Sequence, residues 1–129
     1  MKLPVNYNEI PQSQRRLVRE EYVKRQNGLC CFCNFPLSQE TPASVKEKYP
    51  LELKYDDRAM IAYRYTGNMN ECTIDMKTGE RRFGYTNAVF PKNMLSNPIH
   101  LHHDHTTGMT IGAVHAYCNV ISFVYVETE

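Results

Sequence analysis

All five histidines of this 129-residue chain lie within sixteen residues of one another, in the segment IHLHHDHTTGMTIGAVHAYCN at positions 99–119. Histidine is a common metal ligand and the side chain that most readily takes up and releases protons near neutral pH. The segment ends with Cys118, which is followed by Asn119. This concentration of residue types indicates a chemical site. The alternative is a surface cluster of histidines without a catalytic role.

Two pairs of residues have the spacing of zinc ligands. Cys30 and Cys33 form a C-x-x-C pair, and His115 and Cys118 form an H-x-x-C pair. Each pair can place two ligands on one tight turn, and together the pairs would complete a closed tetrahedral zinc site. The alternative is that the cysteines are small buried apolar residues and that His115 is a core histidine. We favour zinc because each pair stands beside a predicted helix end.

The chain has five cysteines, and three of them are crowded into CCFC. An odd number with this spacing fits a disulfide framework poorly and a metal site well. Cys31 and Cys72 are not needed for the zinc site, and we expect both to be buried thiols.

A helix is expected to lead into the first pair. Ser13 can cap a helix that begins near Gln14, and Asn27 with Gly28 supplies a stop. The chain then passes directly into Cys30. The expected apolar stripe of this helix consists of Leu17, Val18 and Tyr22.

The histidine segment predicts two strands and a helix. The residues T-T-G after His105 would close a hairpin whose return strand runs over 109–114, and His115 would begin the turn into a final helix. This order would bring Asn119 back towards His102. Adjacent residues on a straight strand point to opposite faces, so His102 and His103 can share one site only if the strand ends or twists there.

Residues 38–98 separate the two halves of this site. They contain a polar, Pro-containing stretch and then RAMIAYRYTG and CTIDMKTGERRFGY, in which MKTGE is typical of a hairpin turn between strands. Connections in compact domains are usually much shorter. We therefore interpret the segment as a β-rich insertion in a single domain that spans residues 1–129. We expect it to be dispensable for the zinc fold but not for binding.

These motifs resemble the HNH, or ββα-metal, nucleases, and they are most similar to the phage recombination endonuclease VII family. That family has a C-x-x-C after a helix, a strand with a D-H-D-H run, a T-G turn, and a C-x-x-C-N at the start of a helix. The spacing from His102 to Asn119 matches without a gap, and QNGLCCFC resembles the family's zinc knuckle. The likeness covers about residues 14–37 and 99–121. It implies an α+β fold with a zinc-stapled ββα-metal core of treble-clef-like form.

The resemblance further implies a metal-dependent endonuclease that hydrolyses DNA phosphodiester bonds. His103 would be the general base that deprotonates the attacking water. His102 and Asn119 would hold one Mg²⁺ or Mn²⁺ ion, and this ion would stabilise the charge that develops on the phosphate and the departing 3′ oxygen. His105 would contact the phosphate, and Asp104 would fix the turn or orient a histidine.

Four features depart from the family pattern. His115 replaces a cysteine, which zinc tolerates. His102 replaces an acid, which favours Mn²⁺ or another transition ion over Mg²⁺. The chain stops eleven residues after Cys118, before the helices with which the family builds its dimer, so a homodimer and the resolution of branched DNA are both left open. The positions where the family is often basic are occupied by Thr106, Met109 and Ile111.

DNA contacts would therefore have to come from other segments. The net charge of +1 is unevenly spread, because residues 1–33 carry six Lys/Arg against three acids, whereas residues 99–129 carry three acids and no Lys or Arg. One candidate set lies on the first helix and consists of Arg15, Arg16, Arg19, Lys24 and Arg25. The other lies on the predicted hairpin and consists of Lys77, Arg81 and Arg82 with Tyr85. The alternative for both sets is a solvated charged face.

Two other classes of function remain open. One is a zinc-stabilised module that binds nucleic acid or protein without cutting, such as a phage-encoded inhibitor or recruiter. The other is a structural zinc protein whose insertion makes an interface. No apolar run approaches the roughly 20 residues of a membrane span, and MKLPVNYNEIPQ lacks the apolar centre of a secretory signal. We therefore expect a cytoplasmic protein, in the host cytoplasm if it is phage-encoded, with no membrane partner.

Overall fold

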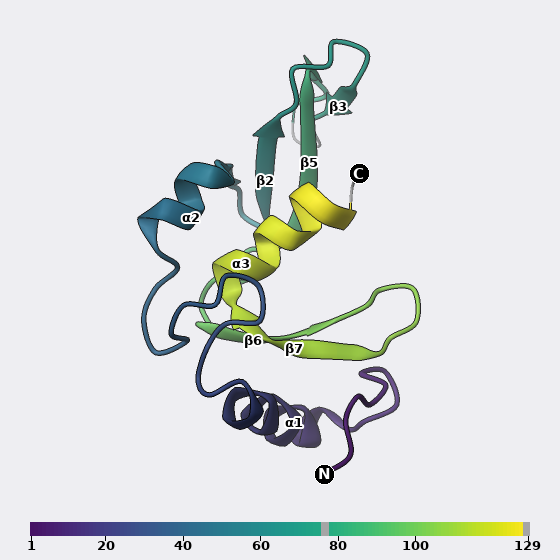
Figure 1. Ribbon diagram of the computed structural model, residues 1–129. Helices are drawn as coiled ribbons and strands as arrows, with labels where there is room; N and C mark the ends of the chain where they lie inside the picture. The colour runs from purple at the N-terminus through teal and green to yellow at the C-terminus, as the bar shows by residue number, and fades with distance from the viewer. Residues whose placement is uncertain (76–77, 128–129) are drawn as a thin grey trace.

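A computed structural model describes residues 1–75 and 78–127 of the chain, which fold into an α+β arrangement of short helices and small antiparallel sheets (Figure 1). The elements in chain order are α1 (Gln12–Arg25), α2 (Ala43–Lys48), β1 (Glu52–Tyr55), β2 (Ala59–Tyr65), β3 (Cys72–Ile74), β4 (Arg81–Phe83), β5 (Tyr85–Pro91), β6 (Ile99–His103), β7 (Thr110–His115), α3 (Ala116–Ile121) and the π-helical turn η1 (Ser122–Glu127). This confirms the predicted α+β class.

Helix α1 begins earlier in the chain than the sequence predicts, and it ends where the sequence predicts. It starts directly after Pro11, whose extended conformation precedes the first turn, so Ser13 lies inside the helix and does not cap it. The predicted stop is confirmed, because Asn27 and Gly28 both have positive φ angles, of 57° and 75°. The predicted stripe is partly wrong: Val18 is buried and Tyr22 half-buried, but Leu17 is 47% exposed.

Strands β6 and β7 form the predicted hairpin, and α3 follows β7 without a break. The turn is held by Asp104, whose carboxylate accepts hydrogen bonds from the backbone N–H groups of Thr106 (2.7 Å) and Thr107 (2.9 Å). Gly108 completes it with a φ of 80°. In Figure 1 the hairpin lies between α1 on one side and α3 on the other, and both helices contact both strands. The segment thus adopts the expected order of two strands and a helix.

The side chain of Gln26, at the end of α1, joins the helix to β7. Its amide nitrogen donates to the carbonyl oxygens of Leu29 (2.8 Å) and Ala113 (2.9 Å), and its amide oxygen accepts from the Ala113 N–H (2.9 Å). The approach is so close that a Cβ on Gly112 would lie 2.8 Å from the Gln26 Oε1 atom. Gln26 therefore fixes the first cysteine pair relative to the strand that leads to the second pair.

We expect Gln26→Leu to destabilise the fold by about 1–3 kcal/mol, because it removes three hydrogen bonds and leaves the Ala113 N–H without its partner. Urea unfolding monitored by circular dichroism measures the effect. Gln14→Leu, an exposed position on the same helix, is the matched control and should change the free energy of unfolding by less than about 0.5 kcal/mol. Equal effects at both positions would contradict the role of Gln26.

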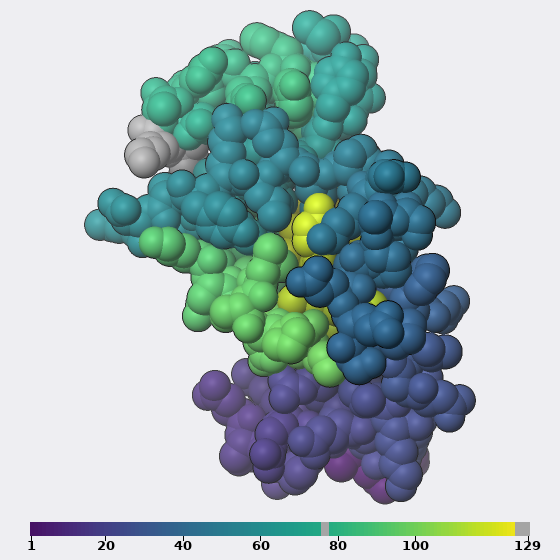
Figure 2. All heavy atoms as spheres, turned by 90° about the vertical axis from the view of Figure 1, so that its left-hand side faces the viewer, coloured from purple at the N-terminus to yellow at the C-terminus, as the bar shows by residue number. Residues whose placement is uncertain are grey.

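Residues 38–98 contribute α2 and two sheets. Strands β1, β2 and β5 form an antiparallel sheet in the order β1-β2-β5, and β3 pairs with β4. The predicted hairpin between β3 and β4 is present, but its MKTGE turn includes Met76 and Lys77, which lie outside the described residues. Figure 2 shows most of this region at one end of the molecule and the N-terminal segment at the other, with small patches of the C-terminal segment visible between them.

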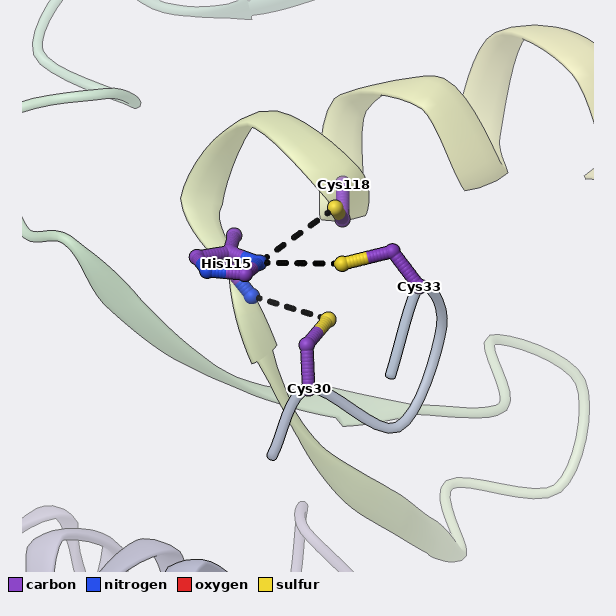
Figure 3. Close-up of side chains that lie close together, drawn as sticks. All are labelled: Cys30, Cys33, His115 and Cys118. Atoms are coloured by element: carbon purple, nitrogen blue, oxygen red, sulfur yellow. Dashed lines mark hydrogen bonds between the residues drawn. The ribbon is translucent and has the colours of Figure 1, made fainter. Parts of the chain in front are cut away.

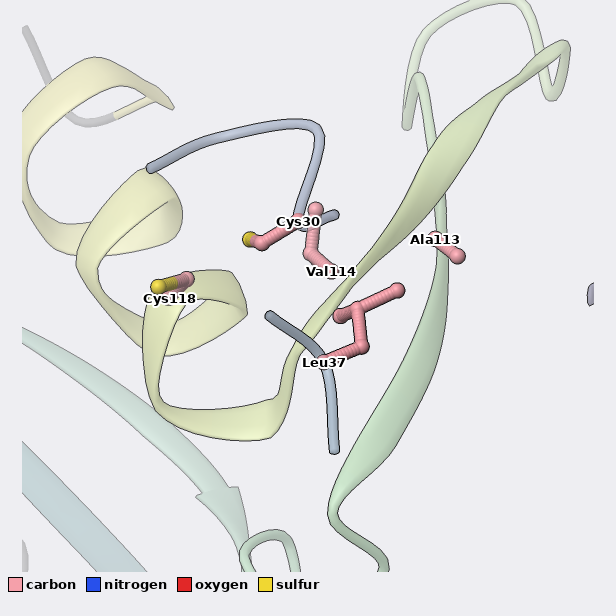
Figure 4. Packing of buried hydrophobic residues seen from close by; sticks show 5 residues of the cluster. All are labelled: Cys30, Leu37, Ala113, Val114 and Cys118. Carbon is pink, nitrogen blue, oxygen red and sulfur yellow. The ribbon is translucent and has the colours of Figure 1, made fainter. Parts of the chain in front are cut away.

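The buried apolar residues form two clusters on opposite sides of α3. The first surrounds the cysteine pairs and consists of Cys30, Leu37, Ala113, Val114 and Cys118 (Figure 4). The second joins strands β2 and β5 to α3 and η1, which together form the C-terminal helix. It consists of Met60, Ala62, Phe90, Val120 and Val124. The insertion therefore shares a core with the helix that carries the site. The expectation that it is dispensable for the zinc fold is not supported, because its removal would expose Val120 and Val124 to water.

Candidate functional site

The first cysteine pair lies on a tight turn directly after α1. The backbone N–H of Cys30 donates to Phe35 O (2.8 Å), and the N–H of Asn34 donates back to Cys30 O (2.9 Å). Asn34 has a φ of 64°, a left-handed conformation that asparagine adopts more readily than most residues. The turn directs the Cys30 and Cys33 side chains towards the start of α3, as Figure 3 shows.

The structure brings all four predicted zinc ligands together. The Sγ atoms of Cys30, Cys33 and Cys118 and a ring nitrogen of His115 all lie within 4.8 Å of one another. His115 Nδ1 is 3.4 Å from Cys33 Sγ and 3.6 Å from Cys118 Sγ (Figure 3). A tetrahedral zinc ion with its usual bond lengths has ligand-to-ligand distances of roughly 3.5–3.8 Å. We call this group the Cys₃His cluster; its composition and spacing are those of a site that could hold zinc.

Groups around the cluster orient its ligands. The Nε2 atom of His115 is 2.9 Å from Pro36 O, so this nitrogen donates and Nδ1 is left to face the sulfurs. Thr41 Oγ1 lies 3.5 Å from Cys118 Sγ, and the His115 backbone N–H donates to Cys30 Sγ at 3.5 Å. Hydrogen bonds from the Cys118 thiol and from backbone N–H groups lower the pKa of Cys30 to about 4. The hydrogen bond between the two cysteines raises the pKa of Cys118. One thiolate is thus already favoured before an ion binds.

The prediction that the other two cysteines are buried is wrong, because Cys31 and Cys72 are both exposed. Cys31 takes part in the fold through its backbone, whose N–H donates to Ala113 O (3.0 Å). Cys72 pairs with Phe83 across β3 and β4, and both side chains are on the solvent-facing side of that hairpin. The register of strands β3 and β4 decides which side Cys72 faces, and the short sequence pattern around Cys72 does not reveal that register.

The remaining four histidines and Asn119 line one pocket of about 350 Å³, which we call the histidine pocket. His102 and His103 both reach it because the pairing of β6 with β7 shifts between them: His102 pairs with Gly112, but His103 pairs with Thr110. This β-bulge supplies the change of direction that two adjacent residues need in order to share a site. The structure therefore gathers the residues proposed for catalysis and adds His100, to which the sequence assigned no role.

Asn119 is a candidate metal ligand because its side-chain oxygen is buried and unpaired among the described residues. The residue is 7% exposed, and its Nδ2 atom lies 3.2 Å from His100 Nδ1. Its Oδ1 atom is buried and has no hydrogen-bond partner among the residues that the structure describes. An amide oxygen is a good ligand for a divalent cation. Within the described residues, the Cys₃His cluster is the one group of three or more His, Cys, Asp or Glu side chains already close enough to share an ion.

His103 is held between aromatic rings. The Tyr7 ring stacks on it with a centroid distance of 3.9 Å and an angle of 6° between the planes, and the His105 ring lies at 4.7 Å. Arg15 covers Tyr7, with its guanidinium carbon 4.0 Å from the ring centre and Nη1 donating to the Tyr7 hydroxyl (3.3 Å). Burial and the nearby His105 lower the pKa of His103, which keeps its imidazole neutral near pH 7.

Tyr7 is a site residue that the sequence did not indicate. It lies on an N-terminal arm whose residues pair with the hairpin turn, through Tyr7 N–H to Gly108 O (2.7 Å) and Thr110 N–H to Val5 O (2.9 Å). A Cβ on Gly108 would lie 2.6 Å from Asn6 Oδ1, so the arm also accounts for the glycine there. Because these contacts join residues about a hundred positions apart, no local pattern near Tyr7 could have indicated them.

The basic residues that were candidates for DNA contact lie in three different places. Arg15 and Arg19 line the histidine pocket. Arg16 and Arg25 are paired with acids on the solvent side of α1, with N–O distances of 4.0 Å to Glu20 and 3.0 Å to Glu21, and Lys24 is exposed. In the insertion, Arg82 packs over Tyr63 (4.6 Å) and Tyr85 (5.0 Å), Arg81 is exposed, and Lys77 lies outside the described residues. Among the described candidates, only Arg15 and Arg19 line the pocket that holds the proposed catalytic residues.

Comparisons of the chain with models of protein families, with curated proteins and with solved structures found no match. Over residues 1–75 and 78–127, no helix has the length and apolar character that a membrane crossing requires.

Proposed function

We propose that this protein is a zinc-stabilised, metal-dependent nuclease that hydrolyses DNA phosphodiester bonds in the histidine pocket. The observation that carries the proposal is the convergence of His102, His103 and Asn119 on one pocket beside two arginines. The resemblance of the hairpin and helix to the HNH nucleases, and to the endonuclease VII family in particular, supports the roles of these residues. The Cys₃His cluster would hold a structural zinc ion next to them.

His102 and Asn119 are the residues that would hold the catalytic ion. The buried Asn119 Oδ1 atom fits this role, since it lacks a hydrogen-bond partner among the described residues. An imidazole nitrogen with an amide oxygen is a donor set that favours Mn²⁺ or another transition ion over Mg²⁺. When bound, such an ion supplies Lewis-acid stabilisation of the charge on the phosphate and on the 3′ leaving oxygen.

The chain's own side chains would do the remaining work. His103, kept neutral by its surroundings, accepts a proton from the attacking water at a ring nitrogen. Arg15 and Arg19 bring positive charge to the same pocket, where His105 would also contact a phosphate oxygen. On the solvent side of α1, Glu20 and Glu21 are paired with Arg16 and Arg25, which makes these two arginines less available to phosphate, so we expect DNA to approach from the pocket side.

Incubation of the purified protein with supercoiled plasmid tests the proposal. We expect nicking with Mn²⁺, slower nicking with Mg²⁺, and none with a chelator. Absence of cleavage of duplex, single-stranded and branched DNA with Mg²⁺, Mn²⁺, Co²⁺ and Ni²⁺ would contradict it.

One observation favours a second candidate, a DNA-binding module of similar form without cleavage activity. Outside the Cys₃His cluster, the described residues contain no group of three or more His, Cys, Asp or Glu side chains already close enough to share an ion. In that case DNA binding would persist while every divalent ion failed to support cutting. A gel-shift measurement beside the plasmid assay separates the two candidates.

The stacking of Tyr7 on His103 predicts a further effect. Tyr7→Ala should lower kcat for plasmid nicking about 10- to 100-fold, because a small displacement of the base is costly when it must meet a water molecule in line with the phosphate. Tyr7→Phe keeps the ring and loses only the hydroxyl that accepts from Arg15, so its kcat should stay within about threefold of wild type. If both variants lose kcat equally, the stack is not what positions His103.

A further inference from the structure

We propose that His100 is a positioning residue that sets the orientation of the Asn119 amide, so that the amide oxygen faces the histidine pocket. This inference rests on the proposed function, because it concerns how the chain presents a ligand to the catalytic ion. It assigns a role to the one pocket histidine for which the sequence offered none.

The contact between the two side chains allows one arrangement of protons. His100 Nδ1 and Asn119 Nδ2 are 3.2 Å apart. An amide nitrogen donates hydrogen bonds and does not accept them, so Nδ1 must be the acceptor and the ring proton must lie on Nε2. His100 lies on β6 and Asn119 on α3, two elements that pack directly against each other.

The same contact fixes the other end of the amide. With Nδ2 held by His100, Oδ1 is directed away from the imidazole, and it is buried without a hydrogen-bond partner among the described residues. A buried acceptor in this condition is unfavourable for folding, and an incoming cation would remove that penalty. The structure thus keeps an oxygen ligand available at a cost to its own stability.

Rotation of the amide by half a turn would remove this arrangement. It would place Oδ1 against the lone pair of His100 Nδ1, which is repulsive, and it would present an NH₂ group to the pocket. An NH₂ group cannot bind a cation, because its nitrogen has no available lone pair. His100 therefore selects the orientation that binds metal, although the inference does not require it to touch the ion.

Three variants of the full, zinc-loaded chain test this assignment by Mn²⁺ binding, measured by electron paramagnetic resonance in the absence of DNA. His100→Phe keeps a ring but has no acceptor, and we expect the dissociation constant for Mn²⁺ to rise about 10- to 100-fold, as for the loss of other groups that orient a ligand. His100→Gln retains an acceptor oxygen and should restore binding to within a few-fold of wild type. Asn119→Ala should bind at least as weakly as His100→Phe.

A second measurement needs no metal. The ¹⁵N spectrum of the wild-type imidazoles should show His100 unprotonated at Nδ1 and protonated at Nε2, and a proton on Nδ1 would overturn the inference. This spectrum tests the role of His100 even if His100→Phe fails to fold, as judged by zinc content and melting temperature.

The outcomes separate this inference from the proposed function. If Asn119→Ala loses Mn²⁺ binding while His100→Phe binds like wild type, the role of His100 is wrong and the nuclease proposal stands. If wild type binds no Mn²⁺, or if Asn119→Ala binds it as tightly as wild type, the proposed metal site fails and the role of His100 fails with it.

Discussion

His103→Ala should abolish DNA cleavage while leaving zinc content, melting temperature and DNA affinity close to those of wild type. A general base contributes typically about 10²- to 10⁴-fold to rate and little to ground-state binding. Single-turnover nicking of supercoiled plasmid, with DNA affinity measured in parallel, determines whether the loss lies in the chemical step. His102→Ala and Asn119→Ala should behave differently and raise the concentration of divalent ion that cutting requires.

The ring stack offers a matched control for this substitution. His103→Phe preserves a flat ring between Tyr7 and His105 but has no nitrogen to accept a proton. It should therefore be as inactive as the alanine variant and at least as stable. If either variant cuts as fast as wild type, the activity is a contaminant or is sited elsewhere, and the roles given to residues 99–119 must be withdrawn.

Loss of one ligand of the Cys₃His cluster should have the largest effect on stability. Zinc binding to structural sites of this kind is worth about 10–16 kcal/mol, which is as large as the whole stability of a typical domain, about 5–15 kcal/mol. Cys33→Ser should therefore abolish the cooperative thermal transition seen by circular dichroism, and a strong chelator should do the same to wild type. Elemental analysis should find one zinc ion per folded wild-type chain.

Cys72→Ser is the matched control, because it makes the same chemical change at an exposed cysteine outside the cluster. Its melting temperature should stay within a few degrees of wild type. Folded, unchelated protein that contains no zinc would contradict the assignment of the cluster. So would equal losses of stability in the two serine variants.

The parts of the site that the sequence predicted are those encoded by short spacings. The C-x-x-C and H-x-x-C pairs indicated the four members of the Cys₃His cluster, and Asn27 with Gly28 marked the end of α1. Each of these signals lies within a few residues, where backbone geometry is set by local chemistry. The hairpin from β6 to β7 was predictable for the same reason, since its turn is specified by Asp104 and Gly108.

The features that the sequence did not reveal depend on distant pairing. Tyr7 reaches His103 because the N-terminal arm lies along the hairpin turn, and the bond between His100 and Asn119 joins a strand to a helix. The exposure of Cys31 and Cys72 follows from register and from backbone contacts made elsewhere. The insertion was expected to be separable because no pattern in residues 38–98 indicates that strands β2 and β5 need the C-terminal helix to cover them.

The distance along the chain between the two halves of the Cys₃His cluster has a consequence during protein synthesis. Cys33 and His115 are 82 residues apart, and at about 5–20 residues per second a ribosome needs roughly 4–16 s to pass from one to the other. Throughout that interval the nascent chain carries the thiols of Cys30, Cys31 and Cys33 without the residues that complete the site. Oxidants and other metals have access to them during this time. The cluster partners of Cys30 and Cys33, and with them the rest of the first apolar cluster, become available only when the last part of the chain is made.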